Sequence, residues 1–159
     1  MDWTRAIDAY CERTDPSYWS EPVNAVTNLA FIVSAIVMWR RCAGWTGGRV
    51  LAAILFAIGV GSWLFHTHAT PWAAMADTTP ILLFTLVYIF LANRDFWGWV
   101  WWIAALGALA YIPYSIALTP VFGALPFFLG AVLALALAFV AWALVFLVVA
   151  LRVLVLEVD

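Results

Sequence analysis

Long apolar stretches separated by short polar ones run through this chain from residue 23 to its end. A helix rises 1.5 Å per residue, so roughly 20 apolar residues cross the hydrocarbon core of a bilayer. The pattern predicts five clear spans, over 23–39, 50–66, 77–92, 96–112 and 127–156. The predicted fold class is therefore all-α, a polytopic membrane helix bundle.

The last apolar run is longer than one span needs. As a single helix it would extend about 45 Å, so it forms either one tilted helix or a cramped pair. A pair would bring the number of spans to six, if the stretch 113–126 joins the first of them. The prolines and glycine between 113 and 126 predict a broken connection there. Residues 1–22 form a polar leader, and residues 23–159 form the transmembrane domain.

The composition of the chain is that of an integral membrane protein. It has 159 residues, of which 67% are hydrophobic, and a mean hydropathy of +1.03, which excludes an ordinary soluble domain. All seven basic residues are arginine, and the lack of lysine excludes a retinal Schiff base. Nothing in the composition indicates a nucleic-acid partner.

Arginines follow the first and third spans, so these loops are predicted to be cytoplasmic and the N-terminus to lie outside the cytoplasm.

Polar residues gather where the second span ends and the third begins. Ser62 and His66 are four residues apart and share one helix face, and Gly59 leaves room for a backbone or ligand to approach. Pro71 is predicted to break the helix, and Asp77 to open the next one. Ionisable groups at membrane depth indicate a functional site, here a metal held by His66 with Ser62 and Asp77 beside a water. Each residue also has an alternative interpretation when taken singly. His66 could lie in the headgroup region, Ser62 could hydrogen-bond to its own helix, and Asp77 could be an N-cap.

The leader is rich in carboxylates close to the membrane, among them Asp8, Glu12 and Glu21. Oxygen ligands of this kind suit Ca²⁺, and a solvated acidic leader is the alternative. Glu21 directly precedes the first span, which favours a role as ligand or tether. In that span Asn24, Thr27 and Asn28 are predicted to form one polar face toward the bundle.

Four motifs of the chain resemble the alkaline ceramidase family, which belongs to a group of seven-span membrane hydrolases that includes the adiponectin receptors. The motifs are Tyr10-Cys11-Glu12-Arg13, Trp19-Ser20-Glu21-Pro22-Val23-Asn24-Ala25-Val26-Thr27-Asn28-Leu29, Gly59-Val60-Gly61-Ser62-Trp63-Leu64-Phe65-His66 and Asp77-Thr78-Thr79-Pro80. They fall within residues 8–93, and the remainder matches by hydrophobicity.

The resemblance implies two metal sites. His66 would be the first of three histidine ligands of a zinc ion, with Ser62 and Asp77 beside the zinc water. A calcium ion would be held by Glu12, Glu21, the carbonyl of Tyr10 and Thr14. Ala9 aligns with an aspartate of the family, which makes Asp8 a displaced substitute.

The chain departs from the family in its histidines. It contains two in total, His66 and His68, and lacks the distal H-x-x-x-H pair of the seventh span. On a helix His68 lies about 200° from His66, so it does not easily replace a lost ligand. We therefore expect either an incomplete chain, resembling a truncated seven-span fold, or a divergent member that has lost zinc hydrolysis.

The activity implied by the resemblance is hydrolysis of the amide of ceramide or a related membrane lipid. Zinc would polarise the carbonyl, Asp77 would act as general base and Ser62 would stabilise the oxyanion. The alternative is a non-catalytic membrane protein that keeps the calcium-tied bundle and binds a lipid. The sequence does not determine the oligomeric state or the lipid.

Overall fold

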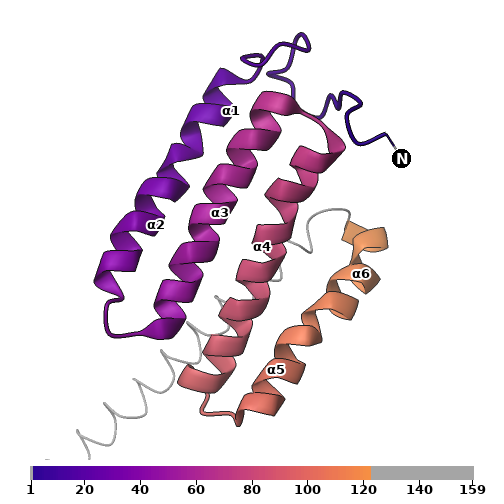
Figure 1. Cartoon of the computed structure of the whole chain (residues 1–159). Coiled ribbons are helices and arrows are strands. Elements are labelled where there is room, and N and C mark those ends of the chain that lie inside the picture. Colours follow the sequence, from indigo (N-terminus) through magenta and orange to yellow (C-terminus); the bar gives the residue numbers. More distant parts are fainter. Residues whose placement is uncertain (1, 123–159) are drawn as a thin grey trace, which may run out of the picture. The chain divides into compact units, whose positions relative to one another are not determined.

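The computed structural model describes residues 2–122, and in this part the chain forms helices and no strands (Figure 1). The contacts divide the chain into two units after Ala108, and each unit is described by itself. The helices are α1 (Pro22–Thr27), α2 (Leu29–Arg41), α3 (Thr46–His68), α4 (Pro71–Leu91), the π-helical turn η1 (Ala92–Phe96), α5 (Trp101–Leu109) and α6 (Tyr111–Phe122).

Four helical stretches are long and apolar enough to cross a membrane. They are Pro22–Arg41, Thr46–His68, Pro71–Phe96 and Trp101–Pro120. They correspond to the first four predicted spans, which confirms the prediction of a polytopic helical bundle. The predicted span 127–156 lies outside the described residues.

The first span is two helices because its polar residues bond to the backbone. The buried Asn28 separates α1 from α2, and its Nδ2 donates to the carbonyl of Asn24 at 2.8 Å. Thr27 also donates to that carbonyl, at 3.0 Å, but its side chain is exposed. The prediction of one polar face toward the bundle therefore holds for Asn28 and is wrong for Thr27.

Helix α3 packs against α1, α2 and α4, and glycines let the backbones approach (Figure 1). A Cβ on Gly61 would lie 2.0 Å from the carbonyl oxygen of Ala76 on α4. A Cβ on Gly59 would lie 2.7 Å from the side chain of Ile32 on α2. The predicted close approach at Gly59 is thus made by a neighbouring helix. Gly61 sets the spacing between α3 and α4, next to Ser62 and Asp77.

The chain breaks between two helices at Pro71, as predicted, but the next helix does not start at Asp77. Helix α3 ends at His68, and Asp77 lies in the second turn of α4, whose first residue is Pro71. Proline is favoured at this position because the first helical N–H has no partner within the helix. The stretch predicted as a broken connection is also helical as far as Phe122, since α6 accommodates Pro113 in its first turn and Pro120 near its end.

We predict that Gly61→Ala destabilises the bundle by about 1–3 kcal/mol, because the added methyl has no space beside the backbone of α4. The measurement is the unfolding midpoint in detergent. Gly44→Ala is the matched control, since a Cβ there meets nothing within 4 Å. Equal midpoints for the two variants would contradict the close contact of α3 with α4.

Candidate active site

The predicted site residues lie at one end of the bundle, where α1 begins, α3 ends and α4 begins. The leader folds over this end (Figure 1). Its N–H at Ile7 donates to the carbonyl of Ala69, the residue that ends α3, at 2.7 Å. Ala69 has a positive φ of 46°, which turns the chain sharply from α3 toward α4. The leader is thereby fixed over the ends of both helices.

Glu21 is the centre of this end, and its carboxylate is almost fully buried, with 2% of the residue exposed. One oxygen, Oε1, lies 2.5 Å from Nε of Arg13, and the other, Oε2, lies 2.6 Å from Nδ1 of His66. A buried carboxylate is stable only when it is paired and hydrogen-bonded, and both conditions are met here. Because an ionised carboxylate can only accept, Nδ1 of His66 is the donor in this contact, and Nε2 is the ring nitrogen that Glu21 does not engage.

Arg13 joins three parts of the chain. Besides Glu21, its guanidinium donates through Nη2 to the carbonyl of His66 at 3.1 Å and through Nη1 to the carbonyl of Asp15 at 3.3 Å. Only 6% of its side chain is exposed. One leader residue therefore holds the start of α1 and the last turn of α3 together.

Ser62 and Asp77 meet across the contact between α3 and α4. Ser62 is buried one turn before His66, and its hydroxyl lies beside the carboxylate of the half-buried Asp77. The structure thus brings together the three residues Ser62, His66 and Asp77 that the sequence singled out.

The Tyr10 side chain also belongs to this site. Its ring packs edge-on against His66, with centroids 4.8 Å apart and planes at 65°. Burial, together with the negative charges of Asp77 and Glu21, raises the pKa of Tyr10 above its ordinary value. Sequence analysis considered only the carbonyl of Tyr10 and gave Arg13 no role. An arginine among leader carboxylates was the available signal for Arg13, whereas nothing marked the phenol.

Three of the five oxygen groups predicted to bind calcium, those of Glu12, Glu21 and the Tyr10 carbonyl, have partners within the protein. The carboxylate of Glu12 accepts the N–H groups of Val23, at 2.7 Å, and Asn24, at 3.1 Å, and so caps α1. The Tyr10 carbonyl accepts the N–H of Arg13 at 2.9 Å. Asp8 and Thr14 are exposed, and the N–H of Thr14 donates to Ser20. This set does not fit a calcium ion, which takes six to eight oxygens.

The structure brings together fewer zinc-ligating side chains than a complete zinc site has. Among the described residues no group of three or more His, Cys, Asp or Glu side chains could hold a metal. His66 has the buried carboxylate partner that metal-binding histidines use. His68 is exposed, with its ring 5.5 Å from that of Tyr18 and 5.2 Å from that of Trp72. Zinc therefore stays a prediction with one supporting ligand.

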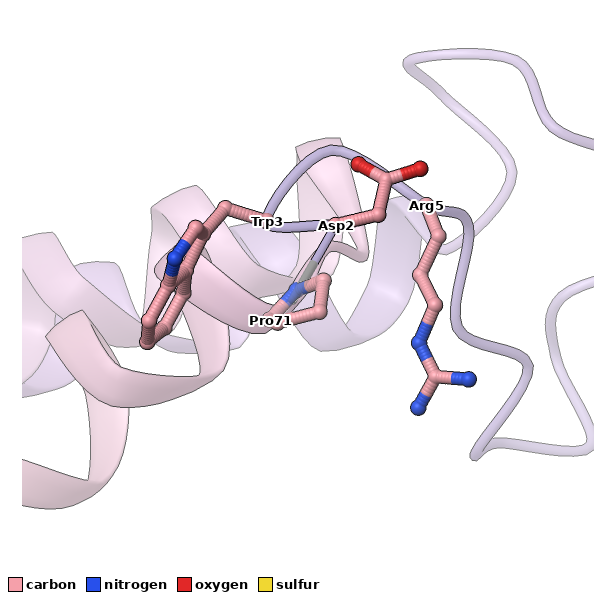
Figure 2. A pocket seen from close by; sticks show the side chains of 4 residues that line it. All are labelled: Asp2, Trp3, Arg5 and Pro71. Carbon is pink, nitrogen blue, oxygen red and sulfur yellow. The ribbon is translucent and has the colours of Figure 1, made fainter.

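A hollow of about 340 Å³ lies near the site but is separate from the predicted residues. Figure 2 shows the side chains that line it, Asp2, Trp3, Arg5 and Pro71. It lies between the first residues of the leader and the start of α4. None of its lining residues is a predicted site residue, so it is not the candidate active site.

We predict that Asp77→Asn lowers the pKa of Tyr10. The substitution removes one of two nearby negative charges, while burial still keeps the pKa above its ordinary value. The measurement is the ultraviolet difference titration of the phenol, with Tyr10→Phe used to assign its signal. An unchanged pKa would place Asp77 away from Tyr10.

A model of the Ceramidase family matches residues 6–158, which extends beyond the motifs within 8–93 that carried the resemblance. Neither a search of curated proteins nor a search of solved structures gives a significant match. The family match and the four apolar helices agree on an integral membrane protein of the ceramidase-like hydrolase type. The match covers nearly the whole sequence, and the chain belongs to the Ceramidase family.

Proposed function

We propose that this protein hydrolyses the amide bond of ceramide or a related membrane lipid. The observation that carries the proposal is the meeting of Ser62, His66 and Asp77 at one end of an apolar helix bundle. The family match supports a ceramidase-like substrate. Apolar side chains exposed on α2 and α4 suit contact with lipid, so a substrate with acyl chains would approach from within the bilayer.

Asp77 is the proposed general base. It takes the proton of a water molecule as the water attacks the amide carbonyl, and it later returns a proton to the leaving amine. The hydroxyl of Ser62 orients this carboxylate before the reaction. As negative charge develops on the carbonyl oxygen, the same hydroxyl is placed to donate to it.

His66 is the proposed ligand of a zinc ion, through the nitrogen that Glu21 does not engage. When bound, zinc would polarise the amide carbonyl and acidify the attacking water. Glu21 fixes the orientation of the imidazole ring, and Tyr10 covers its face. These contacts limit the movement of His66.

We propose that the site end of the bundle faces the outside of the cytoplasm. Arg40 and Arg41 end α2, and Arg49 lies in the first turns of α3. Arg49 precedes His66 by a helix length of about 25 Å, which is close to the thickness of the hydrocarbon core. The arginines therefore lie at the other end of the spans, and they favour the cytoplasmic side.

A second candidate function is binding of a lipid without cleavage. It is favoured by one observation, namely that the described residues bring no three metal-ligating side chains together. In this alternative the buried Glu21 pairs serve only to hold the leader on the bundle.

We predict that Asp77→Asn lowers kcat for hydrolysis of a short-chain fluorescent ceramide by about 10²–10⁴-fold, because the base is lost. Ser62→Ala should lower kcat by about 10²-fold, because the developing oxyanion loses a hydrogen-bond donor. Asp95→Asn is the matched control and should keep its activity, because Asp95 lies in η1, beyond the end of α4, and pairs with Arg94. Full activity in Asp77→Asn would contradict the proposed mechanism, and an inactive parent protein would favour lipid binding.

Zinc content separates the two candidate functions further. Elemental analysis of the purified protein should find about one zinc per chain, which His66→Ala loses and His68→Ala keeps. No zinc in the parent protein would remove the metal from the proposal.

A further inference from the structure

Arg13 is a buried cation that the proposed hydrolysis does not use. It lies in the leader, yet its guanidinium contacts residues far apart in the sequence, the side chain of Glu21 and the backbone of His66. A third contact, to the carbonyl of Asp15, keeps the leader curled around the guanidinium. Three of its five N–H donors are therefore engaged with oxygen atoms.

The oxygens around Arg13 are of the kinds that a calcium ion would take, namely one carboxylate and two backbone carbonyls. Two of the other oxygen groups predicted for calcium accept hydrogen bonds from protein N–H groups. Glu12 caps the start of α1 with both carboxylate oxygens, and the Tyr10 carbonyl accepts the N–H of Arg13 itself. A calcium ion would have to displace these donors before it could gather six ligands.

Charge balance also argues against a calcium ion at this position. Glu21 is 2% exposed, and a buried carboxylate without a positive partner is strongly destabilising. Arginine stays protonated at any pH at which the protein is folded, so its charge is permanent. Arg13 therefore gives the buried Glu21 carboxylate a permanent positive partner without a bound metal ion.

We propose that the Arg13 guanidinium is a built-in cation that takes the place of a bound calcium ion in this leader, holding Glu21, and through it His66, in position. Arg13 is thus a positioning residue. The proposal does not depend on whether the protein cleaves its lipid.

The experiment compares thermal unfolding of the full chain in detergent with 1 mM CaCl₂ and with EGTA, together with direct calcium binding by titration calorimetry. The parent protein should bind no calcium, and its midpoint should be equal in the two buffers. Arg13→Ala should lower the midpoint in EGTA by about 5 °C or more, because Glu21 loses its partner. Calcium should then raise the midpoint of this variant by several degrees, since the freed oxygens can bind the ion.

Two control variants make the result specific. Arg5→Ala removes an exposed leader arginine that has no contact with Glu21, and it should show neither effect. The double variant Arg13→Ala/Glu21→Gln lacks the carboxylate and should lose the calcium response. A purely structural role for Arg13 would lower the midpoint without creating any calcium dependence.

Two outcomes would overturn the proposal. One is a parent protein that binds about one calcium per chain and is stabilised by it. The other is a folded Arg13→Ala variant that calcium does not stabilise. If Arg13→Ala does not fold, the calcium titration of the parent protein decides alone: binding overturns the proposal and no binding supports it.

Discussion

The arrangement of this protein depends on one buried carboxylate. Glu21 lies where the polar leader meets the first span, and its two oxygens are shared between a leader cation and a histidine of α3. Low dielectric surroundings make such pairs strong when complete and very unfavourable when one partner is missing. The same interaction therefore fixes the leader, the start of α1 and the ring of His66. Stability and site geometry are linked here through a single side chain.

A second constraint acts between helices. Lipid tails are as apolar as the side chains of the helices, so the hydrophobic effect does not favour contacts between helices over contacts with lipid. Close packing of small residues therefore holds the spans together. Gly61 lets α3 touch the backbone of α4 at Ala76, and the adjoining residues Ser62 and Asp77 then face one another. On each helix the residue of the polar contact directly follows the residue of the close backbone contact. The meeting of Ser62 and Asp77 is thus a result of backbone approach as much as of polarity.

The sequence predicted what depends on periodicity and spacing. Hydrophobic length identified the spans, and the interval of four placed Ser62 and His66 on one face. It could not predict contacts between distant segments, so the three-way role of Arg13 and the packing of the Tyr10 ring on His66 were missed. The break at Pro71 was predicted, but the start of the next helix was placed too late, at Asp77, because a proline that ends one helix is also suited to the first turn of the next. Thr27 shares the polarity of Asn28, but of the two only Asn28 is buried.

The central claim is that Glu21 holds His66 by its Nδ1 proton, and the tautomer of His66 tests it most directly. The chain has two histidines, so ¹⁵N-histidine labelling of a His68→Gln variant in bilayers would leave His66 as the one labelled ring. We predict that Nδ1 carries a proton, read from its ¹⁵N shift. A ring whose Nδ1 lacks a proton would contradict the account.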